Sequence, residues 1–310
     1  MNKPTAFYVF NNDLIKWTGE DGKLNCLQIC QDNDASSPRD NQDNLTIMAC
    51  FHRRYLLGDN LADKSGDKYE PLTYLRKLVK DTVSGDTLVA AVKADKCPRL
   101  RVSPSDQHFP LYNIFGGEDD ELLVENVAAE NLASELADII DCSDDIVGFN
   151  GCLSLLSDYM EYLPLWLYDH SGITMSCGAR TYPYSDRWDS CQVGWIFAKK
   201  ETLIKEGVAT EENWRKVAKE VMEYDVKVYD DFLTGQVYGY QLYEADQPES
   251  PNEEPDWEMT DSCWGFYGDD IMKNGIADDV NIKDIIKNGA YITGTVKEVC
   301  TVSYEFKFAS

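Results

Sequence analysis

The residue types best suited to chemistry in this chain lie close together in residues 168–191. This loop contains Asp169-His170-Ser171 and, further on, Cys191, so an acid, a base and two candidate nucleophiles are neighbours in sequence. A hydroxyl or thiol activated by a histidine is the chemistry of a covalent hydrolase. Triad members meet in space rather than in sequence order, however, and the Gly-x-Ser-x-Gly motif is absent. A hydrolase-like enzyme that uses this loop is therefore kept as the alternative, and we assign no catalytic residue.

The chain has three histidines that could contribute to a metal site, His52, His108 and His170. None of them forms a spaced pair, and none of the ten cysteines forms a Cys-x-x-Cys motif. The phosphate-binding lysine motif and the Gly-x-Gly-x-x-Gly fingerprint are also absent. The sequence therefore predicts no metal and no cofactor, with a structural zinc or an intersubunit disulfide as the open alternatives.

Residues 168–197 also have a structural interpretation, as a long polar loop between an apolar run and a strand over 192–198. Internal ion pairs such as that of Arg187 with Asp189 would hold this loop, and aromatic packing would support it. We expect Trp188 and Trp195 to be largely buried. The residues assigned to this structural loop are Tyr168, His170, Arg187, Trp188 and Asp189.

The strongest compositional signal is a net charge of -26, from 55 acidic and 29 basic residues in a chain of 310. Such a surface repels nucleic-acid phosphates and anionic membranes, and it attracts basic protein surfaces. We expect no binding to duplex DNA at physiological salt. There is no apolar run long enough to span a membrane and no signal peptide, so we expect a cytoplasmic protein whose cysteines are reduced and buried.

The sharpest change in composition is an acidic insertion over residues 244–261, with eight carboxylates, three prolines and no basic residue. Repulsion among these carboxylates favours an extended or disordered segment outside the core. It is either a solvated loop or a segment that lies against a basic surface of a partner, with Trp257 as an aromatic anchor. The candidate partner-binding residues are Glu249, Glu253, Glu254, Asp256, Trp257 and Glu258.

A basic insert, His52-Arg53-Arg54, stands out in this acidic chain. Its arginines could pair with nearby carboxylates of the same protein, or they could bind an anion. The internal ion pairs are the favoured interpretation.

The spacing of apolar residues predicts helices over 70–83, 126–140, 210–235 and 281–287. Aromatic and β-branched runs predict strands over 6–17, 23–30, 87–92, 192–198, 236–243 and 291–308, and apolar sequence resumes over 261–268. Residues 97–120 are interpreted as irregular. Because strands do not alternate regularly with helices, we expect an α+β fold with a mostly antiparallel, mixed sheet and a few packed helices. The expected regions are 1–150, 151–243, the insertion 244–261, and C-terminal strands over 262–310.

Several sequence blocks, in order along the chain, resemble proteins encoded by phages and other mobile elements. These blocks are Ser37-Pro38-Arg39-Asp40, Cys50-Phe51-His52-Arg53-Arg54-Tyr55, Tyr168-Asp169-His170-Ser171-Gly172, Trp188-Asp189-Ser190 and Asp261-Ser262-Cys263-Trp264-Gly265-Phe266-Tyr267-Gly268. Among named families, the chain resembles the Gabija anti-defence proteins. That resemblance implies homo-oligomers in the bacterial cytoplasm that wrap a nuclease–helicase complex and stop it from engaging DNA.

Overall fold

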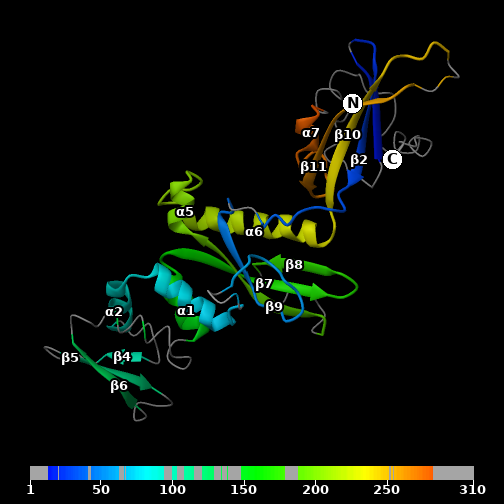
Figure 1. The fold of residues 1–310 in the computed structure, drawn as a ribbon. Helices are drawn as coiled ribbons and strands as arrows, with labels where there is room; N and C mark the ends of the chain where they lie inside the picture. Colours follow the sequence, from blue (N-terminus) through cyan, green and yellow to red (C-terminus); the bar gives the residue numbers. More distant parts are fainter. Residues whose placement is uncertain are drawn as a thin grey trace. The chain divides into compact units, whose positions relative to one another are not determined.

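A computed structural model gives the fold, and Figure 1 shows its elements. It describes residues 13–19, 21–40, 43–62, 66, 68–93, 100–102, 108–114, 121–128, 134, 138, 148–178, 188–250, 253 and 255–281. The chain divides into two compact units, each built from several segments. The first comprises 1–41, 169–175 and 226–310, and the second comprises 42–168 and 176–225.

The first unit is built on a four-stranded sheet with the order β1-β2-β10-β11. Its strands are β1 (Asp13–Thr18), β2 (Leu24–Gln31), β10 (Val237–Ala245) and β11 (Glu258–Tyr267), and all neighbours are antiparallel. One face carries the core, in which Leu27, Ile29 and Tyr240 are buried against Ile276 of the short helix α7 (Ile276–Asp279). Side chains alternate between the faces of a strand, so the polar residues between these positions lie on the other face.

A second four-stranded sheet has the order β3-β9-β7-β8. Its strands are β3 (Thr46–Cys50), β7 (Met160–Asp169), β8 (Ile173–Cys177) and β9 (Ser190–Lys199). Helices α1 (Pro71–Thr82), α2 (Gly85–Lys93) and α4 (Phe149–Leu156) contribute buried residues to the same core as Ala49 and Phe197 of this sheet. In the second unit a small antiparallel sheet is formed by β4 (Leu100–Val102), β5 (His108–Ile114) and β6 (Glu121–Ala128).

The longest helix of the described chain is α6 (Trp214–Leu233), preceded by the short helix α5 (Lys200–Lys205). At its start, Trp214 packs under the guanidinium of Arg215, 4.4 Å from the ring centroid. Arg215 also donates to Glu161 of β7 at 2.6 Å. Further along, Asp225 accepts a hydrogen bond from the hydroxyl of Thr46 in β3. These polar contacts place the first part of α6 on the second sheet.

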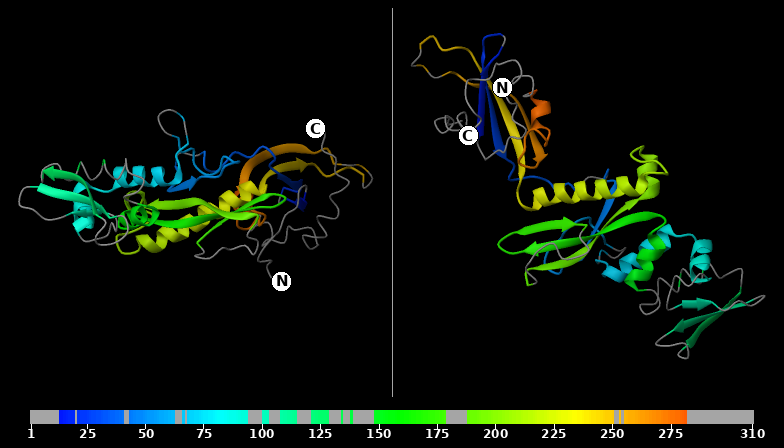
Figure 2. Two further views of the ribbon diagram at one scale, coloured as in Figure 1. Left: turned by 90° about the horizontal axis from the view of Figure 1, so that it is seen from below. Right: turned by 180° about the vertical axis from the view of Figure 1, so that it is seen from behind.

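The predicted α+β class with mostly antiparallel sheets is confirmed. Helices α1 and α6 occupy the predicted helices 70–83 and 210–235, and strands β2, β9 and β10 occupy predicted strands. Strand β11 begins inside the acidic insertion and continues into the C-terminal region. Figure 2 shows the described ribbon from two further sides. Of the predicted strand 6–17, the described part is β1; the predicted strand 291–308 lies outside the described residues, as does the helix 281–287 beyond its first residue.

Two sequence-based predictions of secondary structure are wrong, and a third is wrong at its start. Residues 87–92 form part of helix α2 rather than a strand, because the hydroxyl of Ser84 caps the backbone of Thr87 at 3.3 Å and Leu88 and Ala91 are buried at helical spacing. Residues 97–120 contain strands β4 and β5, which a proline-rich sequence concealed. The predicted helix 126–140 cannot begin at its first residue, since residues 126–128 end strand β6.

Candidate functional site

The acidic insertion forms the connection of the β10–β11 hairpin. The two strands pair from Val237 with Tyr267 to Glu244 with Glu258, so the sheet extends into both ends of the insertion. In Figures 1 and 2 the connection extends beyond the end of the sheet. We call residues 246–257 the acidic connection. Glu254 of the predicted binding set lies outside the described residues.

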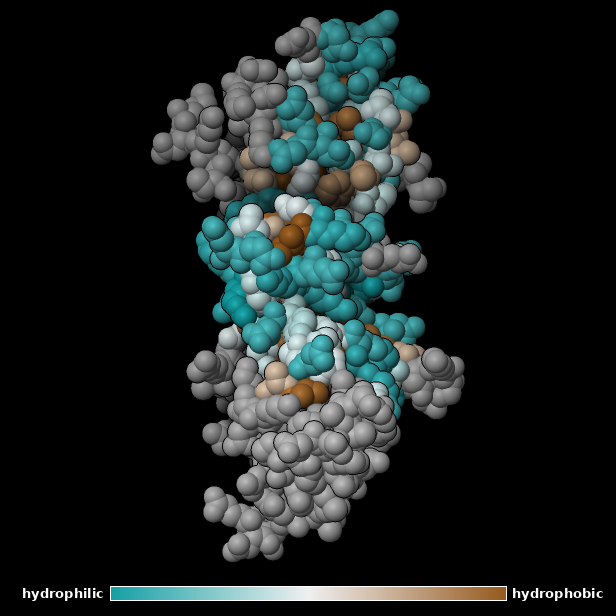
Figure 3. Space-filling view, turned by 90° about the vertical axis from the view of Figure 1, so that its left-hand side faces the viewer, coloured by the Kyte–Doolittle hydropathy of each residue, from teal (hydrophilic) through white to brown (hydrophobic). Residues whose placement is uncertain are grey.

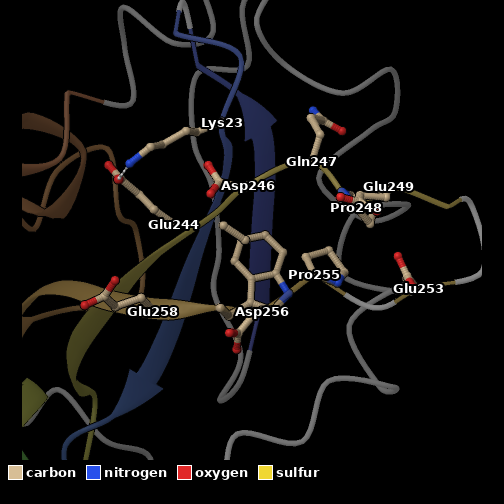
Figure 4. Close-up of a pocket in the computed structure, with 12 residues that line it drawn as sticks. Lys23, Glu244, Asp246, Gln247, Pro248, Glu249, Glu253, Pro255, Asp256 and Glu258 are labelled. Carbon is tan, nitrogen blue, oxygen red and sulfur yellow. Dashed lines mark hydrogen bonds and ion pairs between the residues drawn. The ribbon is translucent and has the colours of Figure 1, made fainter.

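Like charges face each other at the start of this connection, where Glu244 stands opposite Glu258. The repulsion is offset by Lys23, whose ammonium lies 3.2 Å from the carboxylate of Glu244 (Figure 4). This ion pair raises the pKa of Lys23. Lys23, which precedes β2, thus offsets the like charges at the base of the hairpin.

The acidic connection surrounds a hollow of about 700 Å³ whose polar lining is mostly carboxylate. Figure 4 shows the side chains of Asp246, Glu249, Glu253 and Asp256 around it. Among the described residues, no group of histidines, cysteines and carboxylates is arranged to hold a metal ion. The lining carries a high negative charge and therefore attracts cationic groups.

Trp257, the predicted partner anchor, faces the protein's own sheet. It is partly buried and packs against Cys26 and Tyr243. The ammonium of Lys16 lies 5.8 Å from the centroid of its ring, a cation–π distance. Trp257 therefore ties the acidic connection to strands β1, β2 and β10.

A different aromatic residue, Trp264 of β11, is presented to solvent, with 45% of its surface exposed. It stands opposite Gly239 of β10, where a Cβ would lie 2.5 Å from the indole Cδ2. The indole thus lies across the glycine and is held in place by the backbone beneath it. Met259, 53% exposed, stands opposite Tyr243, four residues from Gly239 on β10, so both exposed side chains share one face.

Sequence reasoning missed this pair of exposed residues, although a signal was present. Gly239 lies between two tyrosines, and a glycine inside a strand often marks a place where another group approaches closely. Only the register shows that Trp264 is the group that fills the space.

Strand β11 stands at the end of its sheet and is exposed along most of its length. The register with β10 shifts at two places, which leaves Thr260 and Gly265 as bulged residues, and Gly265 has a φ of 87°. Bulges and charged residues on an edge strand prevent the addition of a further strand. The exposed surface of β11 is consequently suited to contact through its side chains.

The stretch with the catalytic residue types is a hairpin rather than a single long loop. Strand β7 ends at Asp169, a turn at His170, Ser171 and Gly172 follows, and strand β8 begins at Ile173. The backbone N–H of His170 donates to the carbonyl of Gly172 at 3.1 Å, and Ser171 has a φ of 58°. His170 and Ser171 are exposed at this turn.

The residues of the predicted structural loop differ in burial and in secondary structure. Tyr168 is partly buried and pairs with Ser190 at the start of β9, next to the partly buried Asp189. Arg187 lies outside the described residues. Cys191, the other candidate nucleophile, is exposed on β9 opposite Leu167.

The expectation that Trp188 is buried is wrong, because 95% of its surface is exposed. It precedes Ser190, the first residue of β9 that pairs with β7, and so lies outside that strand pairing. Trp195, in contrast, stands in the middle of β9 between β3 and β7, and it packs against Phe149 and Phe51 with ring centroids 5.6 Å and 6.4 Å away. Trp195 is partly buried beside the core of the second unit.

The three histidines have separate local surroundings. The ring of His52 stacks on Tyr55 with centroids 4.9 Å apart, and His170 lies in the exposed turn described above. His108 belongs to strand β5, where the structure describes the backbone. No disulfide joins any two of the cysteines that the structure describes.

Comparisons with protein-family models, with curated proteins and with solved structures find no match to this chain.

On the side shown in Figure 3, hydrophilic residues cover most of the described surface, and hydrophobic residues are exposed in small separate patches. No helix within the described ranges is long and apolar enough to cross a membrane.

Proposed function

We propose that the protein is an inhibitor that binds a DNA-handling nuclease complex of a bacterial anti-phage defence system and blocks its access to DNA. The observation that carries this proposal is the β10–β11 hairpin, which combines an acidic connection with a fixed, exposed tryptophan on an edge strand. The resemblance to Gabija anti-defence proteins supports the choice of target, and it adds a homo-oligomer as the acting form.

Charge explains why such a hairpin suits a DNA-handling protein. Enzymes that hold DNA present lysine and arginine to its phosphates, and a dense group of carboxylates can occupy the same surface. Asp246, Glu249, Glu253 and Asp256 are all exposed around the hollow. The net charge of -26 raises the rate of encounter with a basic surface, and it disfavours binding to DNA itself.

Trp264 would increase the affinity for the partner by slowing dissociation, whereas the carboxylates would increase the association rate. An aromatic side chain has about 150–250 Å² of surface, so the 45% that is exposed corresponds to about 70–110 Å². Burying that area against a partner contributes about 2–3 kcal/mol at about 25 cal/mol/Å². The side chain is already held on Gly239, so little conformational entropy is lost when it binds.

The test is a reconstituted Gabija nuclease–helicase complex whose binding to and cleavage of DNA are measured with increasing amounts of this protein. We expect the wild-type protein to suppress both. Replacing Asp246, Glu249, Glu253 and Asp256 by their amides should slow association and weaken its dependence on salt, because exposed charges act through a field that about 0.15 M salt screens beyond about 8 Å. Trp264→Ala should instead speed dissociation, for a loss of about 20- to 100-fold in affinity.

The matched control removes four exposed carboxylates of the second unit, Asp86, Glu201, Glu212 and Glu223. This variant has the same net charge as the hairpin variant, so an equal loss of inhibition in both would show that only total charge matters. His170→Ala and Cys191→Ala should leave inhibition intact. If instead these two variants abolish it while the fold is retained, the enzyme that uses residues 168–191 is the better explanation.

A further inference from the structure

The basic insert lies in a loop of the second unit, residues 51–58, which follows strand β3 and which we call the basic loop. Its two arginines, Arg53 and Arg54, are both exposed. The internal ion pairs expected from the sequence are not formed by Arg53, which makes no ion pair with any residue that the structure describes. The loop therefore presents positive charge on a chain whose net charge is -26.

Both ends of the basic loop are fixed by backbone hydrogen bonds. At its start, the N–H of Phe51 donates to the carbonyl of Val193 at 2.7 Å. At its end, Gly58 forms a bridge with Ala49, and Asp59 donates its N–H to the carbonyl of Met48 at 2.9 Å. The carboxylate of Asp59 accepts the N–H of Met48 at 2.9 Å.

Gly58 makes this closure possible. Its φ is 66°, and a Cβ there would lie 3.0 Å from the sulfur of Cys50 and would overlap the carbonyl oxygen of Met48. Only glycine combines the left-handed backbone with so close an approach.

The interior of the basic loop is also ordered by contacts. The Nδ1 atom of His52 accepts the backbone N–H groups of Arg54 and Tyr55, both at 3.3 Å. The His52 ring stacks on the ring of Tyr55, and the guanidinium of Arg54 lies 5.9 Å from the centroid of the same ring. The loop is thus shaped before it meets any partner, which lowers the entropy cost of binding.

Beside the arginines the loop exposes an aliphatic residue. Leu56 is 83% exposed, whereas its neighbour Leu57 is buried and anchors the loop to the unit. An exposed leucine next to two exposed arginines gives the surface both an apolar and a charged element. A bare phosphate would use only the charged one.

We propose that the basic loop docks an acidic segment of a partner protein, in which carboxylates stand beside an apolar side chain. Arg53 and Arg54 can pair with carboxylates through parallel N–H···O bonds, and Leu56 contacts the apolar neighbour. Nucleic acid fits less well, since the net charge of -26 opposes a long run of phosphates and leaves the leucine without a role. This surface has the opposite charge to the β10–β11 hairpin and lies in the other unit, so it gives the protein a second and different partner surface.

The test uses the full chain and a fluorescein-labelled Gly-Ser peptide that carries two glutamates beside a leucine, followed by anisotropy. The double variant Arg53→Glu with Arg54→Glu should raise the dissociation constant by about tenfold or more, since charge-assisted hydrogen bonds are lost. Leu56→Ser should weaken binding several-fold. The matched control, Lys205→Glu with Lys219→Glu, changes the net charge by the same amount at exposed sites of the same unit. It should bind the peptide as tightly as the wild-type chain does.

Four results would overturn the proposal. The wild-type chain fails to bind the glutamate peptide, or it binds an otherwise identical glutamine peptide equally well. A DNA oligonucleotide displaces the peptide at lower concentration than unlabelled peptide does. Finally, sedimentation without peptide shows that the wild-type chain is an oligomer and that, among the variants, only the double variant of Arg53 and Arg54 is not. That result would mean that the basic loop binds a second copy of this chain. Circular dichroism of each variant establishes that the fold is intact.

Discussion

Replacing Gly194 by alanine should destabilise the second unit by about 3 kcal/mol through a single methyl group. Gly194 lies in β9 and pairs with Cys50 of β3. A Cβ on Gly194 would overlap the carbonyl oxygen of Ala49 and would lie 2.9 Å from its carbonyl carbon and 3.2 Å from the Cα of Cys50. All three atoms belong to the backbone, so no side chain can move aside.

The magnitude follows from these distances. Carbon atoms in good contact lie about 3.5–4.0 Å apart, so β3 and β9 would have to separate locally by at least about 0.6 Å. The neighbouring hydrogen bond from Phe51 to Val193 is 2.7 Å long and would stretch with them. Overpacking of a tight site costs about 1–3 kcal/mol. One or two weakened backbone hydrogen bonds add about 1 kcal/mol each.

Gly172→Ala is the matched control. Gly172 has the same φ as Gly194, 158°, but a Cβ there would meet nothing within 4 Å. Urea unfolding followed by circular dichroism gives the free energy of each variant, and hydrogen exchange of the β3 and β9 amides reports on the second unit specifically. The reasoning is refuted if the two variants differ by less than about 0.5 kcal/mol, the ordinary effect of a surface substitution.

Two further predictions concern ionisable groups. Burial raises the pKa of Tyr240, Tyr243 and Tyr267, all in the first unit, so the folded state keeps them neutral when the unfolded chain would ionise them. These tyrosines should not affect the free energy of unfolding below a pH of about 10, and the free energy should fall as the pH rises further. Tyrosinate absorbance, followed together with circular dichroism, checks this. Ionisation of these tyrosines at a lower pH than unfolding would contradict it. Burial raises the pKa of Cys26 and Cys177 to about 12. Iodoacetamide at a pH of about 8 should therefore modify the exposed Cys191 first, as measured by peptide mass spectrometry. Equally fast labelling of Cys26 or Cys177 in the native protein would contradict this, because it would show that they are accessible thiolates.

Local sequence signals determined several elements on their own. Apolar residues at helical spacing, with Pro71 at the start of α1 and Gly235 after α6, marked the two helices whose buried faces the structure shows. Aromatic and β-branched runs marked β2, β9 and β10. Composition located the acidic insertion, because a run of carboxylates with prolines is visible without any tertiary contact.

Tertiary structure decided where the exposed and buried tryptophans lie. The sequence predicted burial for Trp188 and a contact with a partner for Trp257, whereas Trp188 is exposed and Trp257 packs against the protein's own sheet. Their exposure depends on which strand lies beside them: β3 and β7 flank Trp195, Cys26 and Tyr243 meet Trp257, and Gly239 supports Trp264 from below. Strand pairings between residues far apart in sequence set these neighbours, and no local pattern encodes them.

The same division applies to the candidate surfaces. The sequence by itself determined that the chain is strongly acidic and that it holds one acidic segment and one basic insert, because charge is a property of residue type. Only the tertiary structure placed β11 at the edge of its sheet, fixed the basic loop by its contacts with Met48, Ala49 and Val193, and left Leu56 and Trp264 exposed. Exposure is the outcome of competition among all apolar side chains for a limited core, so it follows from the whole packing and not from any one stretch of sequence.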